Sequence, residues 1–180
     1  MFQELLARLA SEFEARRLPY MVIGGQAVLV HGEPRLTRDI DITLGASADE
    51  VDAVLDAVQK VGLKPLIENP REFVRDTWVL PCADTHSGIR VDLMFSFTEY
   101  ERQAMDRAVR VTIGGSDVRI ATAEDLVVLK ILAGRPRDLE DARTVLLKNP
   151  KLDRDYVTRC LSALEVDTGQ PLLARLNNFV

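Results

Sequence analysis

Cysteine and histidine are scarce in this chain of 180 residues. Its two cysteines, Cys82 and Cys160, lie far apart and neither belongs to a CxxC motif, which argues against a disulfide framework and against a zinc site. The two histidines, His31 and His86, have no second histidine at ligand spacing. We therefore expect a protein that works in the reducing cytoplasm.

Long hydrophobic runs are also missing. No apolar stretch is long enough to cross a bilayer, and residues 2–17 mix charged and apolar residues at helical spacing, unlike a signal peptide. We expect no membrane partner. The formal net charge of -5 argues against a surface that attracts nucleic acid everywhere, although it leaves room for a local basic groove.

The chain has no internal repeat and no Ser/Gly-rich linker, and its patterns divide it into strands and helices. Apolar runs and turn signals predict strands at residues 20–23, 39–44, 73–81, 89–95, 109–113 and 118–120. Helical spacing and capping-box pairs predict helices at residues 2–17, 26–31, 47–61, 98–108, 122–133, 137–148 and 153–164, with a short one from residue 171. We therefore expect an α/β (α+β) fold: a small mixed β-sheet flanked by helices in residues 1–121, and a C-terminal helical region in residues 122–180 packed on that core.

Two acids alternate with apolar residues in the second predicted strand. Residues two apart in a strand point to the same face, so Asp39 and Asp41 project together, with Cα atoms roughly 7 Å apart, while Ile40 and Ile42 face the core. Two carboxylates held side by side repel each other unless a cation lies between them. A hard divalent ion such as Mg²⁺ fits such oxygen ligands, whereas the alternative is an exposed edge strand with acidic outer positions.

A third acid, Asp92, interrupts the apolar strand of residues 89–95. An aspartate that faced the core there would be costly, so we expect it to point into a cleft beside Asp39 and Asp41. Three acids on neighbouring strands can hold two metal ions about 4 Å apart. The sequence thus predicts a metal site with two Mg²⁺ ions on Asp39, Asp41 and Asp92.

Two glycines stand between the first strand and the short helix that follows it. Gly24 and Gly25 would let backbone amides approach a phosphate closely, next to a helix N-terminus that favours anions. By themselves they could equally form a plain turn. Followed by the two acids on the next strand, they indicate a nucleotide site.

These features together resemble the nucleotidyltransferase (DNA polymerase β-like) superfamily. The resemblance rests on residues 23–25, a short helix, Asp39-Ile40-Asp41-Ile42 and then Asp92, and it extends over roughly residues 18–147. Within the superfamily, the segment RLTRDID at residues 35–41 is similar to the AbiEii-type toxin nucleotidyltransferases of bacterial toxin–antitoxin systems. The stretch EDLVVLKILAGRPRDLEDARTVL is similar to the later motifs of that group, which place a lysine on one helix and an aspartate on the next. The chain is shorter than typical AbiEii toxins. The acid that follows Lys130 also comes sooner in the sequence than the motifs of that group lead us to expect.

The late stretch also has a chemical interpretation of its own. Lys130 would offer a point charge to a triphosphate, although most helix lysines are simply solvated. Asp138 and Asp141 share a helix face, where one of them could accept a proton from an acceptor hydroxyl, or both could complement the helix dipole. Arg35 and Arg38 flank the acids and could hold triphosphate or balance their charge.

The resemblance implies an Mg²⁺-dependent, two-metal enzyme that transfers a nucleoside monophosphate (NMP) from a nucleoside triphosphate (NTP) to a hydroxyl. In this assignment the catalytic residues are Asp39, Asp41, Asp92, Lys130 and either Asp138 or Asp141. The nucleotide-binding residues are Gly24, Gly25, Arg35, Thr37, Arg38 and Lys130. The AbiEii group implies an RNA acceptor, such as the 3′ end of tRNA, and a cognate antitoxin. A small-molecule or protein acceptor, or a catalytically silent nucleotide-binding module, is the alternative.

Overall fold

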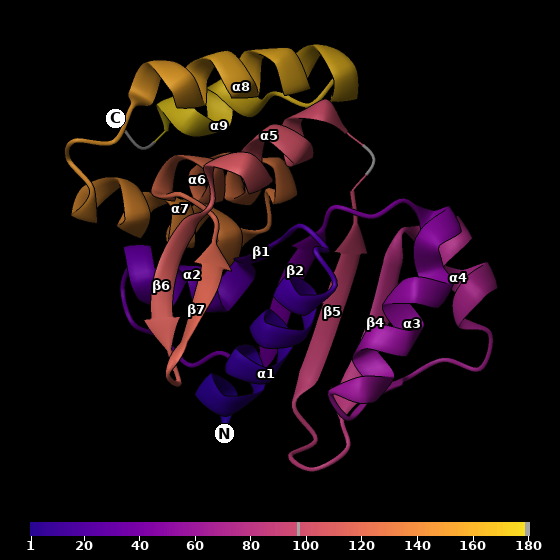
Figure 1. Cartoon of the computed structure of the whole chain (residues 1–180). Coiled ribbons are helices and arrows are strands. Elements are labelled where there is room, and N and C mark those ends of the chain that lie inside the picture. The colour runs from indigo at the N-terminus through magenta and orange to yellow at the C-terminus, as the bar shows by residue number, and fades with distance from the viewer. Residues whose placement is uncertain (97, 179–180) are drawn as a thin grey trace.

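Seven strands form one mixed sheet in the computed structural model, which describes residues 1–96 and 98–178. The strand order is β3-β4-β5-β2-β1-β7-β6 (Figure 1). The strands are β1 (Tyr20–Ile23), β2 (Asp39–Leu44), β3 (Leu63–Pro65), β4 (Val79–Asp84), β5 (Arg90–Phe95), β6 (Val109–Ile113) and β7 (Ser116–Ile120). The central strand β2 pairs with β5 in parallel and with β1 in antiparallel orientation. The predicted α/β fold with a mixed sheet is confirmed.

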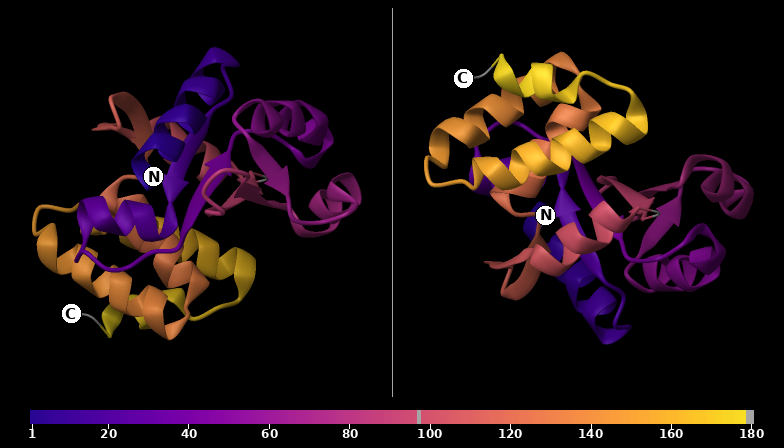
Figure 2. Two further views of the ribbon diagram at one scale, coloured as in Figure 1. Left: turned by 90° about the horizontal axis from the view of Figure 1, so that it is seen from below. Right: turned by 90° about the horizontal axis from the view of Figure 1, so that it is seen from above.

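The helices gather in separate groups around this sheet. They are α1 (Phe2–Ala15), α2 (Gly24–His31), the 3-10 turn η1 (Ala48–Glu50), α3 (Val51–Lys60), α4 (Pro70–Thr77), α5 (Glu99–Arg107), α6 (Ala123–Ala133), α7 (Pro136–Lys148), α8 (Arg154–Thr168) and α9 (Leu172–Asn177). Both views of Figure 2 place α3 and α4 at the opposite end of the molecule from α7, α8 and α9. The helix α2 contacts both α6 and α7, so the elements around the first two strands meet the helices of the late chain.

Local sequence explains most of these boundaries. The capping box at Ser47 and Glu50 is present, with the Ser47 backbone N–H donating to the Glu50 carboxylate at 2.8 Å. At the start of α6 the Thr122 hydroxyl accepts from the Asp125 backbone N–H at 3.1 Å. The predicted capping box at Ser47 is confirmed, and at Thr122 the side-chain cap is present, while the Asp125 carboxylate accepts from the Thr122 hydroxyl and not from its backbone N–H. The division into residues 1–121 and 122–180 stays a prediction.

The predicted strand over residues 73–81 is wrong in its first half. Pro70 occupies the first turn of a helix, where its missing N–H costs nothing, and α4 continues to Thr77 with Val74 as its buried residue. Trp78 then adopts a left-handed conformation (φ 59°) and ends the helix, so β4 begins at Val79. The strand β3, which has only three residues, was not predicted from the sequence.

A helix that could cross a membrane does not occur among the described residues.

Candidate active site

Gly24 and Gly25 form the first turn of α2 itself and not a separate turn before it. Gly24 has a positive φ of 58°, and a Cβ built on it would lie 1.9 Å from Asp41 Oδ2 and 2.9 Å from Asp41 Cβ. A Cβ on Gly25 would lie 2.4 Å from Thr37 Oγ1. Both glycines are therefore required by close approach: the N-terminal turn of α2 lies directly against the acidic strand.

The acid pair takes the predicted orientation on β2. Ile40 and Ile42 are fully buried, while Asp39 and Asp41 are half-buried on the other face and line a cavity. Burial, together with the charges of Asp39 and Asp92, raises the pKa of Asp41 to about 6. Burial is the larger cause of this shift, and the mutual repulsion that the sequence predicts for the carboxylates adds to it.

Asp92 lies on β5 directly opposite Asp41 in the parallel ladder. Its carboxylate accepts two hydrogen bonds from Arg90 Nε, at 2.9 and 3.0 Å. Asp92 does not line the cavity that contains Asp39 and Asp41. The structure thus brings Asp92 to the neighbouring strand, as predicted, and adds Arg90 as its counter-ion. The pattern Arg90-x-Asp92 on one strand face is the signal that could have revealed this pair.

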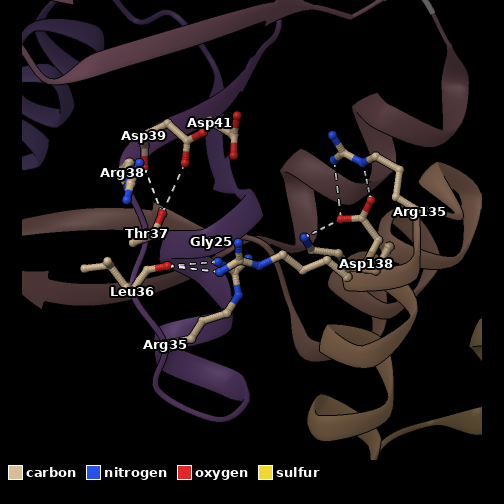
Figure 3. A pocket seen from close by; sticks show the side chains of 11 residues that line it. Gly25, Arg35, Leu36, Thr37, Arg38, Asp39, Asp41, Arg135 and Asp138 are labelled. Atoms are coloured by element: carbon tan, nitrogen blue, oxygen red, sulfur yellow. Dashed lines mark hydrogen bonds and ion pairs between the residues drawn. The ribbon is translucent and has the colours of Figure 1, made fainter.

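The cavity has a volume of about 600 Å³ and a strongly polar lining (Figure 3). Five cations line it beside three acids: Arg35, Arg38, Lys130, Arg135 and Arg137 beside Asp39, Asp41 and Asp138. This local excess of positive charge stands out in a chain of net charge -5. The cations come from the loop before β2, from α6 and from the start of α7, so the cavity lies where the sheet meets the late helices.

The Thr37 and Arg38 side chains differ in their surroundings. Thr37 Oγ1 lies 3.2 Å from both the Asp39 backbone oxygen and Asp39 Oδ1, so its hydroxyl can donate to either (Figure 3). Arg38 is exposed and, within the described part of the chain, has no hydrogen bond or ion pair. Thr37 therefore contacts the acid strand, and Arg38 is available to a ligand.

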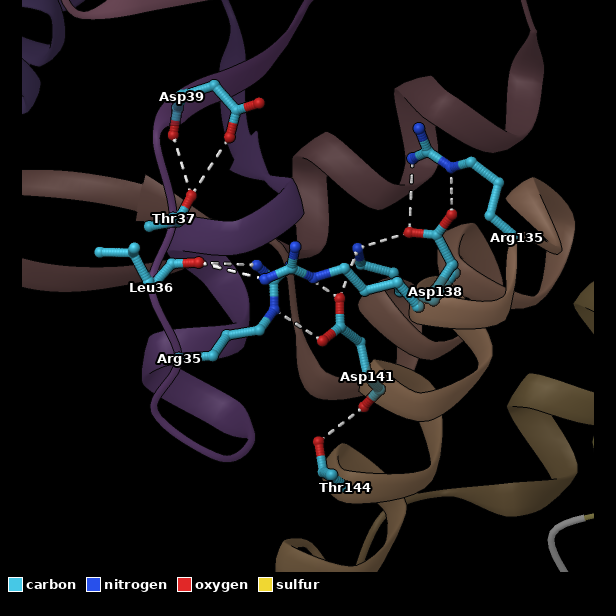
Figure 4. Close-up of polar contacts among 10 residues, drawn as sticks. Arg35, Leu36, Thr37, Asp39, Arg135, Asp138, Asp141 and Thr144 are labelled. Atoms are coloured by element: carbon cyan, nitrogen blue, oxygen red, sulfur yellow. Dashed lines mark hydrogen bonds and ion pairs between the residues drawn. The ribbon is translucent and has the colours of Figure 1, made fainter.

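Lys130 is buried instead of lying on a solvated face. Only 7% of it is exposed, and its Nζ lies 2.7 Å from Asp138 Oδ1 and 2.9 Å from Asp141 Oδ2. Asp141 also accepts from Arg35 Nε and Nη2, each at 2.8 Å, and Asp138 from Arg135 (Figure 4). Asp138 and Asp141 share a face of α7, as predicted, but both carboxylates are already engaged by cations.

The pKa values of these two acids follow from their partners. Burial raises the pKa of Asp141, but hydrogen bonds from Arg35 and Lys130 outweigh burial and hold it below its ordinary value. Hydrogen bonds from Arg135 and Lys130 do the same for Asp138. Both acids stay ionised at neutral pH, which makes them weak proton acceptors.

Solved structures with the same arrangement of elements include an antibiotic-resistance factor, ANT(2'')-Ia. Its solution structure has a TM-score of 0.65 and 14% sequence identity, and the alignment covers 93% of this chain and 92% of that chain. An antigenic nucleotidyltransferase-like protein from Paracoccidioides brasiliensis has a TM-score of 0.59 and 16% identity, with 97% and 91% covered. The lincosamide antibiotic adenylyltransferase LnuA, solved with lincomycin bound, has a TM-score of 0.54 and 18% identity, with 79% and 94% covered. At these identities the likeness shows that the fold is shared.

No curated protein sequence shows significant similarity to this chain. A family model described as "Nucleotidyltransferase of unknown function (DUF6036)" matches residues 2–170. That match covers β1, α2, β2 and β5 and reaches through the cation-bearing helices α6 and α7. The chain therefore belongs to the DUF6036 family of nucleotidyltransferases.

Proposed function

We propose that this nucleotidyltransferase transfers an NMP from an NTP to an acceptor hydroxyl and releases pyrophosphate. The observation that carries the proposal is the set of five cations gathered beside Asp39 and Asp41 in one cavity of an acidic chain. Cations at such a density suit a triphosphate, and the two acids suit the metal ion that accompanies it.

The acids present fit Mg²⁺ chemically. Asp39, Asp41 and Asp92 offer carboxylate oxygens, the ligands that Mg²⁺ prefers, and the raised pKa of Asp41 comes first from burial and then from the charges of the other two acids. Within residues 1–96 and 98–178, no three acidic, His or Cys side chains converge closely enough to hold a metal by themselves. Joint ligation by Asp39, Asp41 and Asp92 therefore stays a proposal, in which phosphate oxygens and water would supply the remaining ligands of Mg²⁺. Two bound ions would activate the acceptor oxygen and neutralise charge on the phosphates.

The chain's own residues would bind and orient the nucleotide. Arg35, Arg38 and Lys130 would contact phosphate oxygens, and the amides of Gly24 and Gly25 would approach them at the N-terminus of α2. The acceptor oxygen forms a bond to the α-phosphorus, the bond from that phosphorus to the bridging oxygen breaks, and pyrophosphate leaves. The hydroxyl proton passes to solvent.

Two acceptor classes remain to be separated. The resemblance of residues 35–41 to AbiEii-type toxins supports an RNA acceptor such as the 3′ end of tRNA, and with it a toxin that has a cognate antitoxin. The cavity of about 600 Å³ instead falls in the range of small-molecule sites, and LnuA, with lincomycin bound, shows that this fold can serve a small acceptor.

The test is a transfer assay with each of four labelled NTPs and Mg²⁺, supplied with total bacterial RNA or with a panel of hydroxyl-bearing antibiotics. RNA, protein and small molecules are resolved separately. The Asp39→Ala/Asp41→Ala double mutant runs alongside, and Glu140→Gln, an exposed charge change on α7, is the matched control.

Label in a tRNA-sized band that the double mutant loses would support the RNA acceptor, and label in an antibiotic would support the small acceptor. Equal labelling by the wild type and the double mutant would refute the assignment of the acids. Absence of any NTP binding by the wild type would refute the proposed function itself.

A further inference from the structure

Asp141 is a buried acid, and both of its carboxylate oxygens contact cations. Its side chain is 6% exposed and it does not line the cavity. Asp141 Oδ1 accepts from Arg35 Nε, and Oδ2 accepts from Arg35 Nη2 and lies 2.9 Å from Lys130 Nζ. Three of the roughly four acceptor positions of this carboxylate are thus occupied by cations, and the side chain lies outside the cavity lining.

The Arg35 contact is bidentate, which fixes the direction of the guanidinium as well as its position. Both bonds measure 2.8 Å, and a third N–H, on Nη1, reaches the Leu36 backbone oxygen at 3.3 Å. A guanidinium has five N–H donors, so two remain for a ligand. Arg35 lines the cavity that holds Asp39 and Asp41, so those donors can serve a phosphate there.

Lys130 is held by the same carboxylate and by Asp138. Its ammonium has three donors, two of which face Asp138 and Asp141. The group of charges beside the cavity has three cations and two acids, so its net charge is +1 (Figure 4). Its members are Arg35, Lys130, Arg135, Asp138 and Asp141. A triphosphate can therefore meet cations that are already oriented, and the cost of ordering their side chains has been met during folding.

We propose that Asp141 is a positioning residue for the triphosphate: it orients Arg35 and Lys130 beside Asp39 and Asp41, and it does not accept the proton of the acceptor hydroxyl. This inference rests on the proposed function. It replaces the role of general base that the sequence suggested for Asp138 or Asp141. The lowered pKa of Asp141 agrees with this role.

The experiment compares Asp141→Asn, Arg35→Gln and the double variant with Glu140→Gln. Glu140 lies one residue before Asp141 on α7 and is exposed, and its one ion pair among the described residues is with Arg143 at 3.6 Å. Glu140→Gln therefore makes the same charge change away from the cavity. Calorimetry measures the dissociation constant of each of the four NTPs with Mg²⁺, and the transfer assay gives KM, kcat and their pH profiles. Circular dichroism checks that each variant is folded.

Asp141→Asn is expected to weaken NTP binding about tenfold, to raise KM by a similar factor and to change kcat less than threefold, with the pH profile unchanged. Because Asp141 acts largely through Arg35, the double variant should bind only slightly more weakly than Arg35→Gln. Glu140→Gln should match the wild type. If Asp141→Asn does not fold, Asp141→Glu keeps the charge while moving the carboxylate, and it should weaken binding without lowering kcat.

Unchanged NTP affinity combined with a hundredfold loss of kcat and the loss of the basic group from the pH profile would overturn the inference and restore Asp141 as a general base. The inference would also be overturned if the effects of Arg35→Gln and Asp141→Asn on the NTP dissociation constant multiplied in the double variant. In both cases wild-type transfer remains, so the proposed function stands. A wild type that binds no NTP overturns the two together.

Discussion

Replacing Gly24 by alanine should disable the site while leaving a folded protein. The new methyl group would lie 1.9 Å from Asp41 Oδ2, 2.7 Å from Cγ and 2.9 Å from Cβ. A rotation of the carboxylate cannot relieve the contact with Cβ, so either the N-terminal turn of α2 or the strand β2 must shift. Asp41 moves in either case.

The cost in stability has two separable parts. An L residue at a φ of 58° costs about 1–2 kcal/mol, and a methyl group inserted into a packed contact costs about 1–3 kcal/mol. The free energy of unfolding should therefore fall by about 2–5 kcal/mol. A domain with a stability of about 10 kcal/mol, the middle of the ordinary range, remains mostly folded after such a loss.

Gly88 supplies the matched control. It has a φ of 72°, yet nothing lies within 4 Å of the Cβ that alanine would add. In urea titrations, the free energy of unfolding of Gly88→Ala should fall only by the cost of the left-handed conformation. The free energy of unfolding of Gly24→Ala should fall by more. In the transfer assay Gly88→Ala should be active and Gly24→Ala at least a hundredfold slower. Equal destabilisation of the two variants, or normal transfer by Gly24→Ala, would show that the contact with Asp41 is not the constraint described here.

Other consequences of the structure can be measured separately. Burial and two neighbouring carboxylates raise the pKa of Asp41 to about 6, above its unfolded value near 4, so its ionisation opposes folding of the metal-free protein. The free energy of unfolding should lose a contribution as pH rises from about 4 to about 6, and Asp41→Asn should flatten that slope in urea titrations. The Asp125 carboxylate on α6 is fully buried, accepts hydrogen bonds from three hydroxyls, one of them that of Tyr156 on α8, and pairs with an arginine. Asp125→Asn should therefore lower the free energy of unfolding by about 3 kcal/mol, and a loss below about 1 kcal/mol in urea titrations would contradict the inference that this carboxylate holds α8 to α6. Burial and the charge of Asp92 raise the pKa of Cys82 to about 12. Iodoacetamide at pH 8 should therefore leave Cys82 unmodified in the folded protein and modify it in urea. Mass spectrometry of the peptide that contains Cys82 would show the difference.

The local order of the chain made much of the fold predictable. Alternation at Asp39, Ile40, Asp41 and Ile42 fixes which side chains are buried, because the period of a strand is a property of its backbone. Capping residues such as Thr122 located a helix start for the same reason, since the unsatisfied N–H groups of a first turn need a nearby acceptor.

Partners distant in sequence could not be predicted in this way. Nothing near Arg35 shows that its guanidinium meets Asp141, 106 residues away, and nothing near Lys130 shows that two carboxylates surround it. The interpretation of Lys130 as a solvated or phosphate-binding cation followed from its own helix alone. Likewise, the apolar residues within 73–81 did not indicate a helix that begins at Pro70. That helix includes the first half of the predicted strand.

The separation of 106 residues between Arg35 and Asp141 also has a consequence for synthesis at the ribosome. Chains emerge from the N-terminus onward, and early segments can fold before later ones exist. The acids of β2 and the glycines of α2 are translated early, but the carboxylate that orients Arg35 appears only with α7. A nascent chain that stops short of residue 141 would carry the acidic pair without its oriented cations. On the proposed function, triphosphate consumption would therefore start only after α7 has been translated.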